Sequence, residues 1–501
     1  MNRRRFLKHS LATAAAATLG APATRTAWAR TGSRPRLPLP TLIDVSKSGR
    51  LDLTAQQGRH IFGSGEPSHT YGYNQDYLGP IVRARRGQEV AVRLRNGLDE
   101  PLATHWHGLL VPGNVDGGPH QAIDPGAVWE PVLPIDQPPS TAWFHAHTHP
   151  HTARQVYAGL AGVFQIDDGQ DDARGLPHEH GIDDFTLILQ DRRFDGAGRL
   201  EYRLGMFDRM HGFRGDRILV NGAVNPRAEV PRSLVRLRLL NGSNARIYHL
   251  RLSDGRPMHL IASDAGYLPQ PIATDELRLA PGERFEVLVD FREGGEVELL
   301  TGPDRNQGGP GMMGMMGALR SQASALLGDD LPVLSFHPND THGSVDRLPD
   351  TISDALDALP TEFVRHRRFS LDMMLGGMPM MRGMMGGGMA GPTMGINGRP
   401  FDMGRLDEQV RLGAIEHWTV ESDMLMHPFH IHGVHFQVLA DETGRSPRLE
   451  NRGEKDTMLV DGRAELAVTF TQPADQKTPF MYHCHVLEHE DAGMMGQLTV
   501  S

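Results

Sequence analysis

Three stretches of this 501-residue chain share one layout, and this repeat constrains the fold more than any other feature. Each stretch alternates apolar and polar residues, passes through a polar turn into another strand pattern, and reaches a Pro-Gly or Asp-Gly turn before a last alternating segment. The stretches begin at Glu89, Leu234 and Glu416, and their later turns begin at Pro125, Pro281 and Asp461. Short alternating strands at this spacing predict an all-β chain of sandwiches or barrels, so we expect three related β domains.

The middle stretch differs from the outer two in its histidines. The first stretch contains T-H-W-H-G and the third contains H-P-F-H-I-H-G, whereas the second has A-R-I-Y-H at the same place, with His249 alone. Histidines that served the fold would be needed in all three repeats. We therefore infer that the histidines of the outer repeats serve chemistry.

Four H-x-H pairs stand out in the histidine clusters of the chain, two in its first third and two in its last. Successive side chains of a strand point to opposite faces, so an H-x-H pair on a strand directs both imidazoles to one face. The pairs supply eight imidazoles, from His105 and His107, His145 and His147, His430 and His432, and His483 and His485.

The only cysteine of the chain, Cys484, lies between two of these histidines. A single cysteine cannot form an internal disulfide, and most free cysteines are small buried apolar residues. Here, however, His489 and Met494 follow closely. Cysteine, two histidines and a weak axial methionine are the ligands of a blue-copper site. Zinc is less well matched, because structural zinc sites with thiolate ligands usually contain two to four cysteines.

The clusters read H-W-H-G, H-x-H, H-x-x-H-x-H and H-C-H-x-x-x-H-x-x-x-x-M, in that order. In these motifs and their order the chain resembles the multicopper oxidases over essentially its whole mature length. The resemblance implies three consecutive cupredoxin-like Greek-key β-sandwich domains, at residues 30–170, 171–340 and 341–501. Copper ligands would lie only in the first and third domains, and the third would carry a methionine-rich insertion at about residues 371–394.

The resemblance also implies four copper ions, assigned residue by residue. A type 1 copper would be bound by His427, Cys484, His489 and the axial Met494. A type 2 copper would use His105 and His430. The two type 3 coppers would use His107, His145 and His485 on one ion, and His147, His432 and His483 on the other.

The activity implied by the resemblance is one-electron oxidation of a substrate coupled to four-electron reduction of dioxygen to water. Because His483 and His485 flank Cys484, an electron entering at the cysteine would have a through-bond route to both type 3 ions, at about 3.8 Å per residue between Cα atoms. Asp116 and Glu490 match acidic positions that the family uses to relay protons. The alternative for both is an ordinary surface or turn acid.

Methionine is concentrated in two glycine-rich stretches. Residues 308–317 and 371–394 contain 13 of the 24 methionines. Glycine and proline at this density oppose helix and strand, so we expect exposed loops. Thioethers select Cu(I), and the combination with an export signal resembles the bacterial cuprous oxidases of copper tolerance.

An additional, labile substrate copper is also implied near the type 1 site. Asp372 and Asp423 resemble its carboxylates, and neighbouring thioethers would come from Met373, Met374, Met424 and Met426. The chain departs from the family pattern in two places. Leu425 stands where a methionine is expected, and no methionine lies just upstream of Asp372.

Three other functions fit parts of this pattern. A general laccase that oxidises small phenolic reductants or aromatic amines would share every copper ligand. A non-catalytic copper-sequestering protein would need the methionine stretches but not twelve intact ligands. A degenerate relative with a division or scaffold role should have lost ligands, and none is missing here.

The N-terminus reads M-N-R-R-R-F-L-K, followed by an alanine-rich apolar stretch and A-W-A. These features predict a twin-arginine signal peptide at residues 1–29, and hence the twin-arginine export machinery as a partner and the periplasm as the location. No later segment approaches the roughly 20 apolar residues of a membrane span. Cleavage would remove five basic residues and lower the formal net charge from −10 to −15, which argues against a nucleic-acid partner. We expect a monomer.

Overall fold

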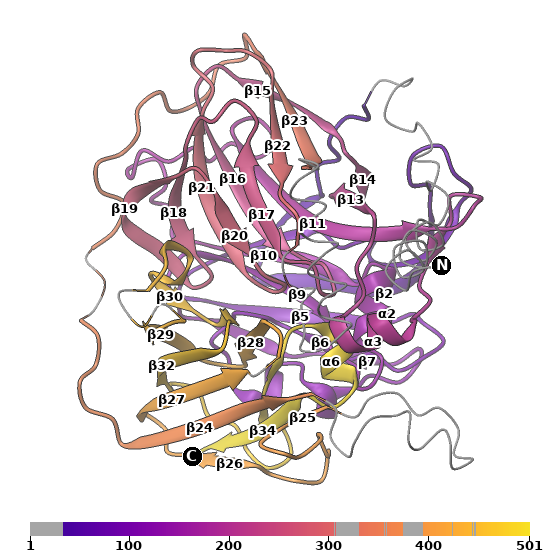
Figure 1. Ribbon diagram of the computed structural model, residues 1–501, viewed down its shortest axis with the longest axis vertical. Coiled ribbons are helices and arrows are strands. Elements are labelled where there is room, and N and C mark those ends of the chain that lie inside the picture. Colours follow the sequence, from indigo (N-terminus) through magenta and orange to yellow (C-terminus); the bar gives the residue numbers. More distant parts are fainter. Residues whose placement is uncertain are drawn as a thin grey trace, which may run out of the picture. The chain divides into compact units, whose positions relative to one another are not determined.

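The alternating segments of the sequence form β-strands that pair into six sheets within the described part of the chain (Figure 1). This computed structural model describes residues 34–304, 306, 330–354, 356, 358–373, 394–422, 424–442, 444 and 447–501. The sheets face one another in pairs, and one large hydrophobic core lies between the two sheets of each pair. Neighbouring strands of a sheet are often distant in sequence, as in Greek-key sandwiches. The prediction of an all-β fold is therefore confirmed.

The N-terminal pair of sheets follows directly from the alternation of the first repeat. The strand β5 reads Q-E-V-A-V-R-L-R-N, and its valines and leucine are buried while the residues between them face outward. One sheet has the order β1 (Leu42–Asp44), β4 (Ile81–Arg85), β10 (Ala161–Asp167), β9 (Ser140–Ala146), β6 (Thr104–His105). The other has the order β3 (Ser68–Tyr73), β2 (Arg50–His60), β5 (Gln88–Asn96), β7 (Val128–Trp129), and β8 (Val132–Ile135) pairs with β5.

In the middle pair of sheets, a strand can be buried on both of its faces, which the alternation of apolar and polar residues does not predict. Every residue of β16, L-V-R-L-R-L-L-N, is buried, because Arg236 and Arg238 form buried ion pairs with Glu286. One sheet has the order β14 (Ala223–Val224), β13 (Arg217–Val220), β11 (Asp184–Phe194), β16 (Leu234–Asn241), β21 (Arg284–Asp290), β18 (Met258–Ser263), β19 (Gly266–Thr274), and β12 (Leu200–Glu201) pairs with β11. The other has the order β15 (Arg227–Pro231), β23 (Leu331–Asn339), β22 (Val297–Thr301), β17 (Tyr248–Leu252), β20 (Leu277–Leu279).

The C-terminal pair of sheets contains the last two histidine clusters. One sheet has the order β25 (Gly395–Ile396), β24 (Arg365–Asp372), β27 (Ile415–Ser422), β32 (Arg463–Thr469), β29 (His435–Ala440), β30 (Glu454–Lys455). The other has the order β26 (Glu408–Val410), β34 (Met495–Val500), β33 (Phe480–Cys484), β28 (His427–Ile431), β31 (Thr457–Val460).

Helices are short in the described residues. They are α2 (Thr152–Ala158), α3 (Met206–His211) and α6 (Leu487–Asp491), with 3₁₀ turns η1 (Gly113–Val115), η2 (Pro119–Gln121) and η3 (Leu449–Asn451). None of these helices has the length and apolar character that a membrane crossing requires. The α2 N-terminus is capped by Asp491 of α6, whose carboxylate accepts hydrogen bonds from the backbone N–H groups of Thr152 and Ala153, both at 3.0 Å.

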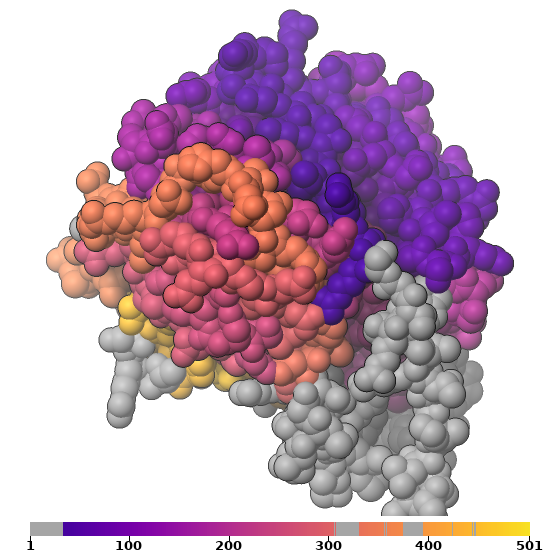
Figure 2. Space-filling view, turned by 90° about the horizontal axis from the view of Figure 1, so that it is seen from above, coloured from indigo at the N-terminus to yellow at the C-terminus, as the bar shows by residue number. Residues whose placement is uncertain are grey.

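The three sandwiches contact one another closely. Residues 36–501 form one compact unit when the chain is divided by its internal contacts, so the domain boundaries predicted near residues 170 and 340 stay predictions. The segment around Leu37 lies against the middle sandwich, where its backbone N–H donates to the carbonyl of Arg227 at 2.7 Å. Figure 2 shows this indigo segment beside the pink surface of the middle region.

The methionine-rich stretches lie mainly outside the described residues, and their described ends differ from the expected loops. Leu371 and Asp372 continue the strand β24, with Leu371 in the core. Met394 is fully buried in the same core. At both described ends of the stretch 371–394, the chain pairs with a strand of the C-terminal sandwich or packs into its core. This contact determines the local structure more than the neighbouring glycines do. The prediction of an exposed loop is therefore wrong for these three residues.

Candidate metal centre

The eight paired histidines come from four strand ends of the outer sandwiches. The first histidine of each pair lies in a strand: His105 in β6, His145 in β9, His430 in β28 and His483 in β33. The second histidine of each pair lies just beyond its strand. The expectation that both would lie on one strand face is therefore wrong, because the strands end between them. All eight are nevertheless buried, with at most 1% of the residue exposed.

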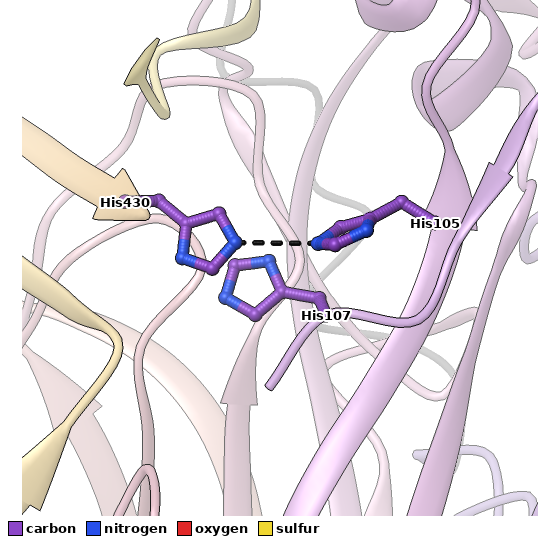
Figure 3. Close-up of side chains that lie close together, drawn as sticks. All are labelled: His105, His107 and His430. Atoms are coloured by element: carbon purple, nitrogen blue, oxygen red, sulfur yellow. Dashed lines mark hydrogen bonds between the residues drawn. The ribbon is translucent and has the colours of Figure 1, made fainter. Parts of the chain in front are cut away.

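The side chains of these histidines converge in three groups. In each group the candidate ligand atoms all lie within 4.8 Å of one another. Two groups are the predicted type 3 sets, His107 with His145 and His485, and His147 with His432 and His483. The third joins the predicted type 2 pair, His105 and His430, with His107, and Figure 3 shows these three rings from two sandwiches pointing toward one another.

Ring nitrogens face ring nitrogens in these groups. The Nε2 atoms of His105 and His430 lie 3.3 Å apart, and His483 Nε2 lies 3.3 Å from both His147 Nε2 and His432 Nε2. A neutral imidazole has one donor and one acceptor nitrogen, so such facing pairs are satisfied by a shared proton or by a metal ion. The Nε2 atoms of His145 and His485 have no hydrogen-bond partner within the described part of the chain. These buried atoms suit metal coordination.

Burial also sets the protonation state that a metal requires. It lowers the pKa of His145, His147 and His485 well below the ordinary value, and the neighbouring imidazoles lower it further. The same direction and first cause hold for His107, His432 and His483. These side chains are therefore neutral near pH 7, and the neutral imidazole is the form that binds metals.

Oxygen atoms fix the outer nitrogens of several rings. His430 Nδ1 donates to the backbone carbonyl of Asp456 at 2.9 Å, and His105 Nδ1 donates to that of Asp116 at 3.0 Å. His432 Nδ1 lies 2.7 Å from Asp116 Oδ2. A ring that donates from its outer nitrogen presents the inner nitrogen as an acceptor, as metal-binding histidines usually do.

Asp456 and Arg284 complete this site and were not found by the sequence reasoning. Asp456 Oδ1 lies 3.0 Å from His107 Nε2. Arg284, on β21 of the middle sandwich, donates to both carboxylate oxygens of Asp456, at 2.7 and 2.6 Å. Burial alone would raise the pKa of Asp456, but Arg284 and His107 hold that pKa well below its usual range. In the sequence, Arg284 is marked only by its place in the turn that begins at Pro281 of the middle repeat, and this turn contains no histidine.

A second, separate group joins His427, Cys484 and His489. Cys484 Sγ lies 3.2 Å from His427 Nδ1 and 3.7 Å from His489 Nδ1, and these two nitrogens lie 3.3 Å apart. All three residues are buried, and the fully buried Met494 belongs to the same core. The short helix α6 turns the chain back after Cys484 and places His489 Nδ1 next to the Cys484 sulfur.

The sulfur of this group is suited to a bound cation. Burial raises the pKa of the Cys484 thiol, so the thiol stays protonated unless a metal ion replaces the proton. One thiolate with two imidazoles in a dry pocket fits Cu better than a hard cation. His483 and His485, on either side of Cys484, belong to the two different three-histidine groups.

Comparisons with known proteins agree with this geometry. Three multicopper oxidase models match residues 54–171, 176–296 and 376–501. The chain is 41% identical to a protein named cell division protein FtsP from Edwardsiella tarda, over 94% of this chain and 93% of that one. The chain belongs to the multicopper oxidase family. A twin-arginine signal model matches residues 1–20.

Solved structures of multicopper oxidases share the fold. A bacterial laccase-like multicopper oxidase, CueO from Ochrobactrum sp., is 43% identical, with a TM-score of 0.84 over 93% of this chain and 100% of that chain. A laccase from Pediococcus acidilactici is 33% identical, with a TM-score of 0.78 over 94% of each chain. The cupredoxin-like architecture of the three sandwiches is thus confirmed, and membership of the family implies bound copper ions.

The two predicted proton-relay acids of this multicopper oxidase both lie against histidines predicted to be copper ligands. Besides its contact with His432, Asp116 Oδ2 lies 3.4 Å from His105 Nδ1. Glu490 is fully buried and lies 3.3 Å from His483 Nδ1 and 3.5 Å from His147 Nδ1. Burial, with the nearby Asp491, raises the pKa of Glu490 well above its ordinary value. Glu490 can therefore hold a proton beside the metal centre near pH 7. The surface alternative is excluded for both acids.

The predicted substrate-copper residues are only partly placed. Asp423 and Met374 lie outside the described residues. Asp372 accepts hydrogen bonds from Ser370 Oγ at 2.7 Å and Gly398 N at 2.5 Å, so it stabilises the turn beside β24. Met373 packs against the C-terminal core. Met424 and Met426 line a cavity of about 580 Å³, beside Leu425 and Asn306.

Proposed function

We propose that this chain binds four copper ions, one type 1, one type 2 and two type 3, and that it oxidises Cu(I) in the periplasm while reducing dioxygen to water. One observation carries the proposal: a buried Cys484 group is joined through consecutive residues to two three-histidine groups. A copper-storage protein has no need of this covalent connection between sites. The bound coppers would supply one-electron oxidation at one end and four-electron reduction of dioxygen at the other.

The side chains of the chain would prepare these ions for reaction. Neutral buried imidazoles would hold the ions, and Asp116 and Asp456 would orient the rings through their outer nitrogens. Glu490 would keep a proton next to His483 and release it as oxygen is reduced. The buried pocket of Cys484 would exclude water from the site that accepts electrons.

Cu(I) is proposed as the substrate because of the methionines. Met424 and Met426 line a cavity, Met426 directly precedes His427 in the chain, and thioethers favour Cu(I) over Cu(II). Small phenolic reductants are the alternative, since the related Ochrobactrum enzyme is described as acting on lignin model compounds. The twin-arginine match supports export, and a folded monomer in the periplasm is part of the proposal.

A different candidate comes from the relatives named cell division protein FtsP, which would suggest a structural role in division. A chain with only such a role has no need of twelve ligand residues. All twelve are present here, and the eleven other than Met494 lie within groups of converging ligand atoms.

Oxygen uptake by the copper-loaded mature protein tests these candidates. Cu(I) and a phenolic donor would be compared in one buffer, with the Cys484→Ala protein as a control. Rapid uptake with Cu(I), and slow uptake with the phenol until Cu(II) is added, is the expected result. Fast phenol oxidation with little Cu(I) oxidation would make the protein a laccase. Bound copper without any uptake would refute the oxidase function, and failure to bind copper would leave the structural role.

A further inference from the structure

Arg214, in the middle sandwich, connects the two segments that lie next to the histidines of the proposed type 1 site. Its side chain is buried, at 7% exposed. Arg214 Nε donates to Asp304 Oδ2 at 2.6 Å, and Nη2 donates to the carbonyl of Asn306 at 3.3 Å. Its Nη1 donates to the carbonyls of His211 and Gly212, the latter at 3.3 Å. One guanidinium therefore joins residues 211 and 212 to residues 304 and 306.

The second of these segments holds the chain at His427. Asn306 Nδ2 donates to the carbonyl of Met426 at 2.7 Å, and the backbone N–H of Met426 donates to Asn306 Oδ1 at 2.9 Å. The Asn306 amide thus pairs with both backbone groups of the residue that precedes His427. Asp304 also accepts from the backbone N–H of Ile247 at 3.3 Å, which anchors this segment in the middle sandwich.

The first segment holds the helix that carries His489. His489 Nε2 donates to the carbonyl of Met210 at 3.1 Å. The backbone N–H of Phe213 donates to Glu488 Oε2 at 2.9 Å. Gly212 lies so close to α6 that a Cβ atom there would come within 2.5 Å of Val486 Cγ1, and its φ of +80° also favours glycine. Residues 210, 212 and 213 are thus hydrogen-bonded to or packed against α6 and its N-cap residue Val486.

We propose that Arg214 is a positioning residue for the type 1 site, and this rests on the proposed function. By joining the two segments, Arg214 fixes the separation of His427 and His489, whose Nδ1 atoms lie 3.3 Å apart. The geometry of a blue-copper site and the residues that orient its ligands tune its potential and its hold on the metal. The middle sandwich contributes no ligand, but through Arg214 it sets where two ligands lie.

Two variants test the proposal in the copper-loaded full-length protein. Arg214→Lys keeps the positive charge but loses the guanidinium fork that reaches four acceptors at once. Asn306→Ala removes only the link to Met426, at a residue that lines a cavity. In both we expect type 1 copper to be about 10-fold less resistant to a Cu(I) chelator, at the low end of the roughly 10–100-fold effect of residues that orient ligands. The charge-transfer band and the reduction potential should shift with it, while the type 2 electron paramagnetic resonance signal stays unchanged.

Arg236→Lys is the matched control. Arg236 is also fully buried in the middle sandwich, but it bonds Glu286, Asp171 and Tyr267, none of which is a proposed ligand. If the type 1 band, potential and copper retention of both test variants equal those of the wild type, the proposal is wrong. An equal shift in Arg236→Lys would also overturn it. Should Arg214→Lys fail to fold, Asn306→Ala decides. A wild-type protein without a type 1 band would instead refute the proposed function itself.

Discussion

Replacing Arg284 with methionine should destabilise the protein and release the type 2 copper. Arg284 is fully buried, and both carboxylate oxygens of Asp456 accept hydrogen bonds from it. Without this cation, the negative charge of Asp456 would stay buried with no full partner. Breaking a buried ion pair in this way costs about 3–5 kcal/mol. For a domain of 150–250 residues, each kcal/mol shifts the melting temperature by about 2–4 °C, so we expect Arg284→Met to lower it by about 6–20 °C.

Scanning calorimetry of the copper-free protein measures this loss, and the chain contains a matched control. Arg292 and Asp290 also lie 2.6 Å apart, but their side chains are 51% and 36% exposed. Exposed pairs contribute less than about 1 kcal/mol, so Arg292→Met should lower the melting temperature by less than about 4 °C. An equal effect of the two substitutions would refute the reasoning from burial.

The same Arg284→Met protein should lose the copper beside Asp456 before it loses type 1 copper. Asp456 contacts His107 Nε2 through its carboxylate and His430 Nδ1 through its backbone carbonyl, at 3.0 and 2.9 Å. Without its arginine, Asp456 would hold these rings less firmly, so we expect about 10–100-fold weaker retention of type 2 copper, which His430 would bind, and of the type 3 copper that His107 would bind. Electron paramagnetic resonance and metal analysis would follow it. Loss of the type 1 signal with type 2 retained would contradict the assignment of Asp456 to this site.

Three further results are expected. Cys484→Ser should abolish the type 1 charge-transfer band and leave the type 2 resonance; a retained band would show that Cys484 is not the ligand. Glu490→Gln should lower the rate of oxygen reduction by about 10²–10⁴-fold without slowing reduction of type 1 copper in stopped-flow experiments, and equal rates would exclude a proton role. Burial lowers the pKa of His145 and His485, so below about pH 6.5 the unfolded chain binds protons that the folded one does not. The stability of the copper-free protein should therefore fall from pH 7 to pH 5, and a flat denaturation profile would contradict this.

The convergence of the paired histidines could be predicted because their signal is local. The H-x-H pairs and the Cys484 motif place donors a few residues apart, and the contrast with the middle repeat separates chemistry from folding. The three-histidine groups then form as expected, although each strand ends between its two histidines. The exact end of a strand depends on neighbouring strands, so the sequence pattern could not place it.

The residues that orient the ligands could not be predicted in the same way. Arg214, Arg284 and Asp456 are single charged residues without a motif, and they lie between 26 and 349 residues from the ligands they would influence. Their role arises only when the middle sandwich packs against the outer two. A buried arginine is also unexpected from composition, because arginine is almost never fully buried without a partner. The middle repeat has no H-x-H pair, so the sequence predicts no copper ligand there, and it gives no sign of this second contribution.

Copper binding should also be measurable as stability, and this separates an oxidase from a protein with only a structural role. Several ring nitrogens, among them His145 Nε2, His427 Nε2 and both nitrogens of His485, lack hydrogen-bond partners within the described residues. Each unsatisfied buried polar group costs roughly 1–3 kcal/mol, so a copper-free chain retains this core at a disadvantage. Free copper at 1,000 times a site's dissociation constant would stabilise the folded state by about 4 kcal/mol for that site.

The corresponding experiment compares melting temperatures with and without copper in the wild type and in His145→Leu. Copper should raise the melting temperature of the wild type strongly, and of His145→Leu less, because one ligand group is incomplete. The copper-free His145→Leu protein should be about as stable as the copper-free wild type, since leucine removes the unpartnered Nε2 atom together with one hydrogen bond, from Nδ1 to the carbonyl of Ala146, without emptying the site. If copper leaves the wild type unchanged, or if His145→Leu destabilises the copper-free protein by several kcal/mol, these histidines are part of the fold and the argument that links their burial to metal binding fails.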